Sequence, residues 1–362
     1  MKRLILILLC VLLLTVPVFG VDVAEEQTRQ FGLDGLEVPD GAKELLPDVS
    51  PTSPGELSGN LGSVLNEGLS RSGGFLREAV RTAASMLAVA IFCSMVTQME
   101  GNRSKDAVLL AGTLAIALLG AGGFRSMVSM GRETLSELRS FSLLLLPALS
   151  AATAASGGIA SGGAVYAASI MVSDILTTLI DKLLIPLLYA FLAVSTANAV
   201  LREQNLTMLR DLLKRLLTSG LKLIVFAFTA YIGLSGVISG AGDAAAVRAA
   251  KLALSTAVPV VGGMISDASE TVLVSARMLR NGAGIFGMVV VLAICLLPLI
   301  RLGVQHLILK LTAALCATVT EKPLSGMIDS VSDALGFLMA MTAAAGFMLL
   351  ISCVAFLKAV SV

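Results

Sequence analysis

Ionisable side chains are scarce in this chain, and several of them lie beside or inside long apolar stretches. Charged residues make up 14% of the 362 residues, whereas a soluble domain has roughly 25%. Asp174, Asp267, Glu270 and His306 are clear cases. Such groups are costly in hydrocarbon unless they face a cavity, one another or the headgroups, and in transporters they relay protons or bind coupling ions. One hypothesis is therefore a secondary transporter that binds its coupling ion at these residues.

No catalytic constellation accompanies these groups. The chain has one histidine, no Gly-Lys dipeptide of a Walker A loop, and no His or Cys spacing that would hold zinc. We therefore expect no enzymatic activity, no cofactor, no metal and no nucleic acid partner. All five cysteines lie in apolar stretches, so we also expect no disulfide framework: Cys10, Cys93, Cys295, Cys316 and Cys353.

Two segments contain helix-breaking residues within apolar surroundings, one in each half of the chain. Unpaired backbone groups at such breaks must be met by protein or water, so broken helices belong in the interior or along a cavity. A pair of breaks is typical of discontinuous helices around a pathway, whereas close packing at small residues is the alternative. The candidate residues for a pore, a gate or a helix break are Pro147, Gly157, Gly158, Gly162, Gly163, Pro259, Gly262, Gly263 and Asp267.

The elements that must position these residues are transmembrane helices. The chain is 56% hydrophobic with a mean hydropathy of +0.90, so the predicted fold is an all-α, polytopic bundle with broken or re-entrant helices. We expect about seven to nine membrane segments within residues 79–362. Residues 141–155 and 164–180 could form two thin spans or one re-entrant hairpin. The apolar stretches are 82–99, 107–124, 141–155, 164–180, 183–200, 223–240, 284–300, 302–320 and 336–357.

The N-terminal region predicts an export signal followed by an acidic segment. Lys2 and Arg3 precede an apolar run that ends at Phe19, which is typical of a signal peptide over residues 1–20. An uncleaved anchor is the alternative. Residues 21–78 contain eleven acidic and four basic residues and four prolines. We expect an extracytoplasmic tether that is extended or only locally helical.

The distribution of basic residues predicts the orientation of the core. Residues 201–222 form its most basic stretch and should lie inside. There, Arg210, Lys214 and Arg215 are candidates for docking a cytoplasmic partner. Counting spans then predicts that residues 321–333 lie outside and that Lys358 lies inside. Residues 125–140 would also lie outside, as an amphipathic helix on the membrane surface.

Several strings together resemble the stage III sporulation protein AE family of endospore-forming bacteria. They are residues 143–150 leading into 155–158, residues 250–253, residues 258–268 and residues 298–300. The most specific is PVVGG-x-x-SDA, which begins at Pro259. The resemblance extends over roughly residues 75–360 and also covers the general plan of signal peptide, acidic outer segment and polytopic core.

This resemblance implies a multi-pass protein of the mother-cell membrane that surrounds the forespore. It implies a non-enzymatic part of a channel or secretion-like complex that joins the two cells and supports forespore development and late forespore gene expression. The implied partners are the other proteins of the stage III sporulation A operon, including a separate secretion-type ATPase, with stage II sporulation protein Q contacted indirectly. The alternative is a self-sufficient secondary transporter or permease for a small solute.

Overall fold

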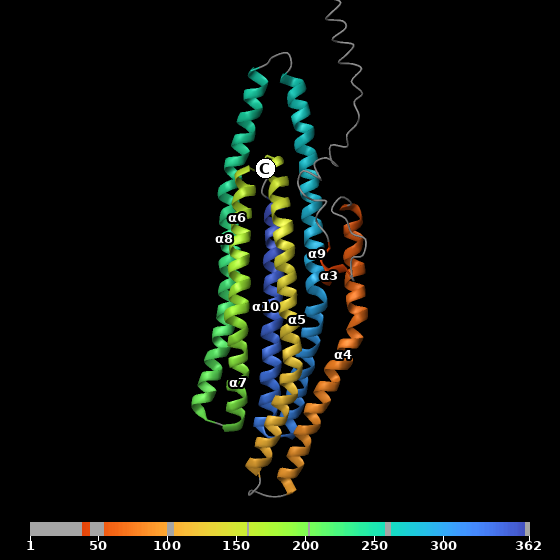
Figure 1. Cartoon of the computed structure of the whole chain (residues 1–362), viewed down its shortest axis with the longest axis vertical. Helices are drawn as coiled ribbons and strands as arrows, with labels where there is room; N and C mark the ends of the chain where they lie inside the picture. The colour runs from red at the N-terminus through yellow and green to blue at the C-terminus, as the bar shows by residue number, and fades with distance from the viewer. Residues whose placement is uncertain are drawn as a thin grey trace, which may run out of the picture.

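The described part of the chain is a bundle of long α-helices (Figure 1). The computed structural model describes residues 38–43, 54–99, 105–157, 159–201, 203–257 and 262–358, so the predicted signal peptide lies outside it. The prediction of an all-α fold is confirmed. The elements are α3 (Asp40–Lys43), α4 (Pro54–Met99), α5 (Lys105–Ala155), α6 (Ile159–Leu179), the π-helix η3 (Ile180–Leu184), α7 (Ile185–Leu201), α8 (Gln204–Ala257), α9 (Gly262–Val319) and α10 (Lys322–Lys358).

Successive helices alternate in direction along the bundle axis. The elements α6, η3 and α7 follow one another without a loop and form a single rod. One end of the bundle holds the end of α4 and the start of α5, the α7–α8 connection and the α9–α10 connection (Figure 1). We call this the lower end. An ion pair crosses it, since Lys105 Nζ at the start of α5 lies 2.8 Å from Glu321 Oε1 beside α10.

Six helical segments in the described residues are long and apolar enough to cross a membrane. The apolar stretches 107–124 and 141–155 both lie in α5, stretches 164–180 and 183–200 in the α6–α7 rod, and stretches 284–300 and 302–320 in α9. At 1.5 Å per residue, the 51 residues of α5 extend about 77 Å, more than twice a hydrocarbon core of about 30 Å. Several helices therefore continue well beyond a single bilayer crossing.

The helix α10 is the centre of the bundle, because it contacts α4, α5, α6, α7, α8 and α9. Its apolar side chains repeat at helical spacing, and Leu324, Ile328, Leu335 and Leu338 are at most 2% exposed. A second group of buried side chains fills the upper half between α5 and α9, where the rings of Phe141 and Phe286 lie 6.4 Å apart. The two groups together form a continuous interior along the bundle.

Glycines allow the closest approaches between these helices. A β-carbon on Gly120 of α5 would lie 2.8 Å from Val331 Cγ2 of α10, and one on Gly287 of α9 would lie 2.5 Å from Leu145 Cδ2 of α5. Small residues bring backbones together in membrane bundles, where packing rather than water exclusion drives helix association. Gly120 and Gly287, which belong to neither predicted break, therefore serve close packing of the helices.

Prolines are accommodated without ending the helices. Pro147 lies inside α5 and Pro298 inside α9. Pro186 follows the π-helix 180–184, and a proline ring clashes with the carbonyl group four residues earlier, here that of Lys182. Widening this turn into a π-helix relieves the clash while the rod continues.

Two predictions about the arrangement are wrong. Residues 201–222 and 321–333 lie at the same end of the bundle, because Lys214 of α8 is bonded to Asp333 of α10. They therefore cannot lie on opposite sides of a membrane, and Lys358 lies toward the other end because α10 runs away from the lower end (Figure 1). Residues 125–140 form the middle of α5 rather than a surface helix, and Arg132 and Arg139 pair with aspartates of the neighbouring rod.

Part of the acidic segment packs against the bundle. Residues 54–78 belong to α4, and the single turn α3 contacts α9. Ala42 in this turn is fully buried. Residues 54–78 are helical throughout as the first part of α4, which is much longer than a local helix.

Candidate functional site

A cluster of four charges joins α8, α9 and α10 near the lower end. Asp333 accepts hydrogen bonds from Lys214 Nζ at 2.5 Å and from Lys310 Nζ at 2.8 Å. Lys310 also pairs with Asp329, one turn earlier on α10, at 2.6 Å. The Asp333 side chain is only 14% exposed, whereas the lysines are nearly half exposed. Two lysines and two aspartates balance, so this cluster needs no further ion.

His306 lies one turn from Lys310 on α9 and binds α10. Its Nδ1 lies 2.7 Å from the carbonyl oxygen of Ser332, which can only accept, so Nδ1 carries the proton. The Ser332 hydroxyl donates back to the carbonyl oxygen of His306 at 2.9 Å. Gly336 makes room for the ring, because a β-carbon there would lie 3.0 Å from His306 Cε1. The geometry is that of a helix-packing histidine.

A charged pocket of about 440 Å³ lies between α5 and the α6–η3 rod. Arg132 Nε lies 2.8 Å from Asp181 Oδ1, and Arg139 forms an ion pair with Asp174. Lys182 and hydroxyl groups complete a lining of Arg132, Leu135, Ser136, Arg139, Thr177, Thr178, Asp181 and Lys182. Three basic side chains and one acidic side chain therefore line this pocket, and Asp174 pairs with Arg139 beside it.

The two ion pairs at the pocket share one register. Arg139 and Asp174 lie equally far from the Ser156–Gly157 turn along the chain, and so do Arg132 and Asp181. On each helix the two charged residues are seven residues apart, nearly two turns, and so lie on one face. Each arginine of α5 therefore faces an aspartate of the antiparallel rod. The sequence-based predictions do not include these pairs. The equal distance of each arginine and its aspartate from the glycine-containing turn could have predicted them.

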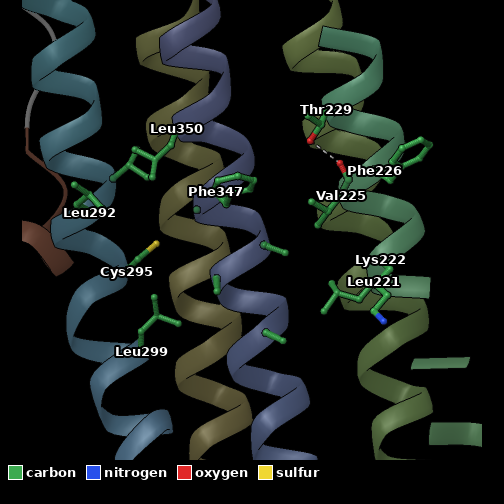
Figure 2. Close-up of a pocket in the computed structure, with 15 residues that line it drawn as sticks. Leu221, Lys222, Val225, Phe226, Thr229, Leu292, Cys295, Leu299, Phe347 and Leu350 are labelled. Atoms are coloured by element: carbon green, nitrogen blue, oxygen red, sulfur yellow. Dashed lines mark hydrogen bonds between the residues drawn. The ribbon is translucent and has the colours of Figure 1, made fainter. Parts of the chain in front are cut away.

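An apolar groove of about 830 Å³ lies at the same level on a different set of helices. Figure 2 shows Leu221, Lys222, Val225 and Phe226 of α8 on one side and Leu292, Cys295 and Leu299 of α9 on the other. The floor is α10, with small residues including Ala340, Ala343, Ala344 and Gly346. Its level matches the charged pocket because Gly131 of α5 packs on Leu338 of α10. Groove and pocket share no lining helix.

The first predicted break forms the turn between α5 and α6. Gly157 has φ 99°, a left-handed conformation that favours glycine. Pro147 lies earlier, inside α5 and exposed, while Gly163 lies on α6 with open space around it. Gly158 lies outside the described residues, and Gly162 lies on α6 where side-chain surroundings are not described.

A buried arginine from α9 meets this turn. Arg280 is 5% exposed and its Nη1 donates to Ser156 Oγ at 3.4 Å. Ser156 in turn donates to the carbonyl oxygen of Thr153 in the last turn of α5. A cation at a helix C-terminus is favoured by the carbonyl groups there.

The second predicted break is not brought to the first. Gly262 and Gly263 begin α9, and Asp267 lies on its second turn, in a part whose side chains are not described. Pro259 lies outside the described residues. Figure 1 shows that this end of α9 extends beyond the α5–α6 turn, and Arg280, which contacts that turn, lies about 27 Å along the helix from Gly262. A pore or gate at these residues stays a prediction.

The three predicted docking residues differ in their surroundings. Arg210 pairs with its neighbour Asp211 at 2.8 Å, and Lys214 is held by Asp333. Arg215 is exposed and has no ion-pair partner among the residues that the structure describes. Of the three, Arg215 is the best placed to meet another protein.

Comparisons with known proteins agree on one family. A family model described as stage III sporulation protein AE matches residues 48–359. The chain is similar to the stage III sporulation protein AE of Bacillus subtilis (strain 168), with 24% identity over 272 residues, which cover 74% of this chain and 68% of the relative. No solved structure matches.

Proposed function

The chain belongs to the stage III sporulation protein AE family, and from this premise we propose that it is a non-enzymatic membrane component of a channel or secretion-like complex between mother cell and forespore. Membership and the six candidate spans make it a multi-pass membrane protein of a sporulation family. The finer proposal places it in the mother-cell membrane around the forespore. There it supports forespore development and late forespore gene expression.

The observation that carries this proposal is the charged pocket at the level of the apolar groove. The face around the groove suits lipid, whereas Arg132, Arg139 and Lys182 at the same level do not. Ionisable groups at membrane depth face water or protein rather than hydrocarbon. A partner subunit or a shared aqueous path against the α5–α6 hairpin would meet this requirement, as expected of one part of a larger assembly.

The proposed partners are the other stage III sporulation A-operon proteins, including a secretion-type ATPase, with stage II sporulation protein Q reached indirectly. In this proposal the lower end faces the mother-cell cytoplasm, because the acidic N-terminal segment precedes α4 at the other side and α8 begins with its basic stretch at the lower end. The ATPase would then dock on this stretch near Arg215.

The alternative, a self-sufficient transporter, needs carboxylates that are free to bind a coupling ion. Asp174 is paired with Arg139, and His306 is engaged by Ser332. The side-chain surroundings of Asp267 and Glu270 are not described. The geometry of the described residues therefore favours an assembly component over a lone transporter.

Affinity purification of a tagged full-length chain from sporulating cells tests the proposal. We expect the ATPase and other operon proteins to be recovered, and Arg215→Glu to lower recovery of the ATPase at least about fivefold because it reverses an exposed charge. Arg81→Glu, an exposed arginine on α4, is the matched control and should change nothing. A chain that purifies alone and transports a solute in liposomes would overturn the proposal.

A further inference from the structure

Two of the three helices that line the groove, α8 and α9, change from charged to uncharged at one level, and α10 changes about 12 Å lower, at Asp333. Lys214 of α8 and Lys310 of α9 both contact Asp333 of α10, which fixes the register of the three helices. The next charges upward are Lys222 on α8 and Arg301 on α9, eight and nine residues further. Above them, residues 223–242, 281–300 and 334–357 contain no Asp, Glu, Lys or Arg.

Each uncharged run is long enough to cross the hydrocarbon core, which needs about 20 residues. The lower end of the groove therefore lies where α8 and α9 pass from hydrocarbon to the headgroup region. Leu221, Lys222 and Leu299 lie at this end, and Thr229, Leu292 and Leu350 lie at the other (Figure 2).

The groove itself has the shape and lining of a site for an alkyl chain. Its volume of about 830 Å³ falls within the usual range of ligand pockets, roughly 300–1,000 Å³. Phe226 and Phe347 form exposed walls above the small residues of the α10 floor. The hydroxyl group of Thr229 is already bonded to the carbonyl oxygen of Val225, so no free polar group faces the groove at that point.

One cation lies at the headgroup end of this apolar lining. Lys222 is exposed, its amino group lies at the lower end of the groove in Figure 2, and it has no ion-pair partner among the described residues. By contrast, Arg301 at this level is occupied by Glu78, at 2.9 Å.

We propose that the groove between α8, α9 and α10 binds one anionic phospholipid, with an acyl chain along the α10 floor and the phosphate against Lys222. The site rests on the chain spanning a membrane and is independent of the proposed role in a sporulation assembly. Charge complementarity favours a lipid over a second copy of the chain, since an apolar helix would leave Lys222 without a counter-charge.

The absence of tryptophan from this chain makes the test direct. Phe347→Trp places a single fluorophore in the groove, and Phe92→Trp places one on the exposed surface of α4 as a control. Full-length variants are reconstituted in phosphatidylcholine vesicles that contain brominated phosphatidylglycerol or brominated phosphatidylcholine as quencher. Quenching then reports which lipid contacts each tryptophan.

In the Phe347→Trp variant we expect brominated phosphatidylglycerol to bind in the groove about fivefold more tightly than brominated phosphatidylcholine. This is the gain expected from one lysine near an anionic headgroup. Lys222→Gln should reduce this preference to near one, and Lys222→Arg should keep it. Lys322→Gln removes an exposed lysine at the start of α10, outside the groove, and should leave the preference unchanged. Circular dichroism confirms that each variant keeps its helices.

Three results would overturn the proposal. The first is equal quenching by both lipids at position 347, and the second is an unchanged preference in Lys222→Gln. The third is quenching at position 92 with none at position 347, which would show that protein rather than lipid covers the groove.

Discussion

At the residue scale, Asp333 is the charge on which the lower half of the bundle depends most. It is the least exposed acid of its cluster, and it holds lysines from two other helices. Asp329 lies one turn away and contacts only Lys310, with its side chain 44% exposed. A carboxylate shared by two lysines in a mostly buried position should contribute more than an exposed one.

We predict that Asp333→Asn lowers the free energy of unfolding by about 1–3 kcal/mol, because it leaves two lysines without their shared counter-charge. Asp329→Asn, the matched control, should cost less than about 1 kcal/mol because an exposed ion pair contributes little. Thermal unfolding in detergent micelles measures both variants. Equal losses would show that Asp333 holds no special place in the cluster.

The side-chain chemistry of single residues could be predicted only in part. His306 is one of the ionisable residues considered for binding a coupling ion, whereas the structure shows it bonded to Ser332 of α10. Lys214 was expected to meet a cytoplasmic partner, but Asp333 engages it. Which partner an ionisable residue finds depends on the register between helices far apart in sequence, and the apolar pattern of one helix carries no such information.

At the element scale, the α5–α6 hairpin shows why windows of hydropathy overcount spans. Charged residues at 125–139 separate two apolar stretches of α5, and charged residues at 174–182 separate two apolar stretches of the α6–α7 rod. In the sequence such charges suggest a boundary between two spans. In the structure both regions lie within helices, and Arg132 and Arg139 pair with Asp181 and Asp174 across the hairpin. The turn itself was predictable from its glycines, and Gly157 takes the left-handed conformation there.

The hairpin register predicts a charge-swap experiment. Arg139→Asp alone places two carboxylates opposite each other, and Asp174→Arg alone places two guanidinium groups opposite each other, so each should destabilise the protein. The double variant should recover much of the loss, with an interaction energy of at least about 0.5 kcal/mol in a double-mutant cycle. The same thermal unfolding measurement applies. Strictly additive losses would contradict the antiparallel pairing of these helices.

At the scale of the whole molecule, the bundle has two unlike faces at one level. The groove face on α8, α9 and α10 is apolar with a cation at its lower end, and the hairpin face on α5 and α6 is charged. Composition alone predicted a membrane bundle. It could not predict this asymmetry, because a count of charges per segment does not tell which helices lie on which side.

The central claim is that the charged hairpin face contacts another protein of a sporulation assembly. Photocrosslinking in sporulating cells tests it most directly, with p-benzoylphenylalanine at Ser136 in the pocket or at Leu118, a 74% exposed leucine on the apolar part of α5, as control. We predict protein adducts from position 136 in excess over position 118, containing a second copy or another operon protein. Crosslinks to lipid alone at both positions, in cells that still sporulate, would contradict the account.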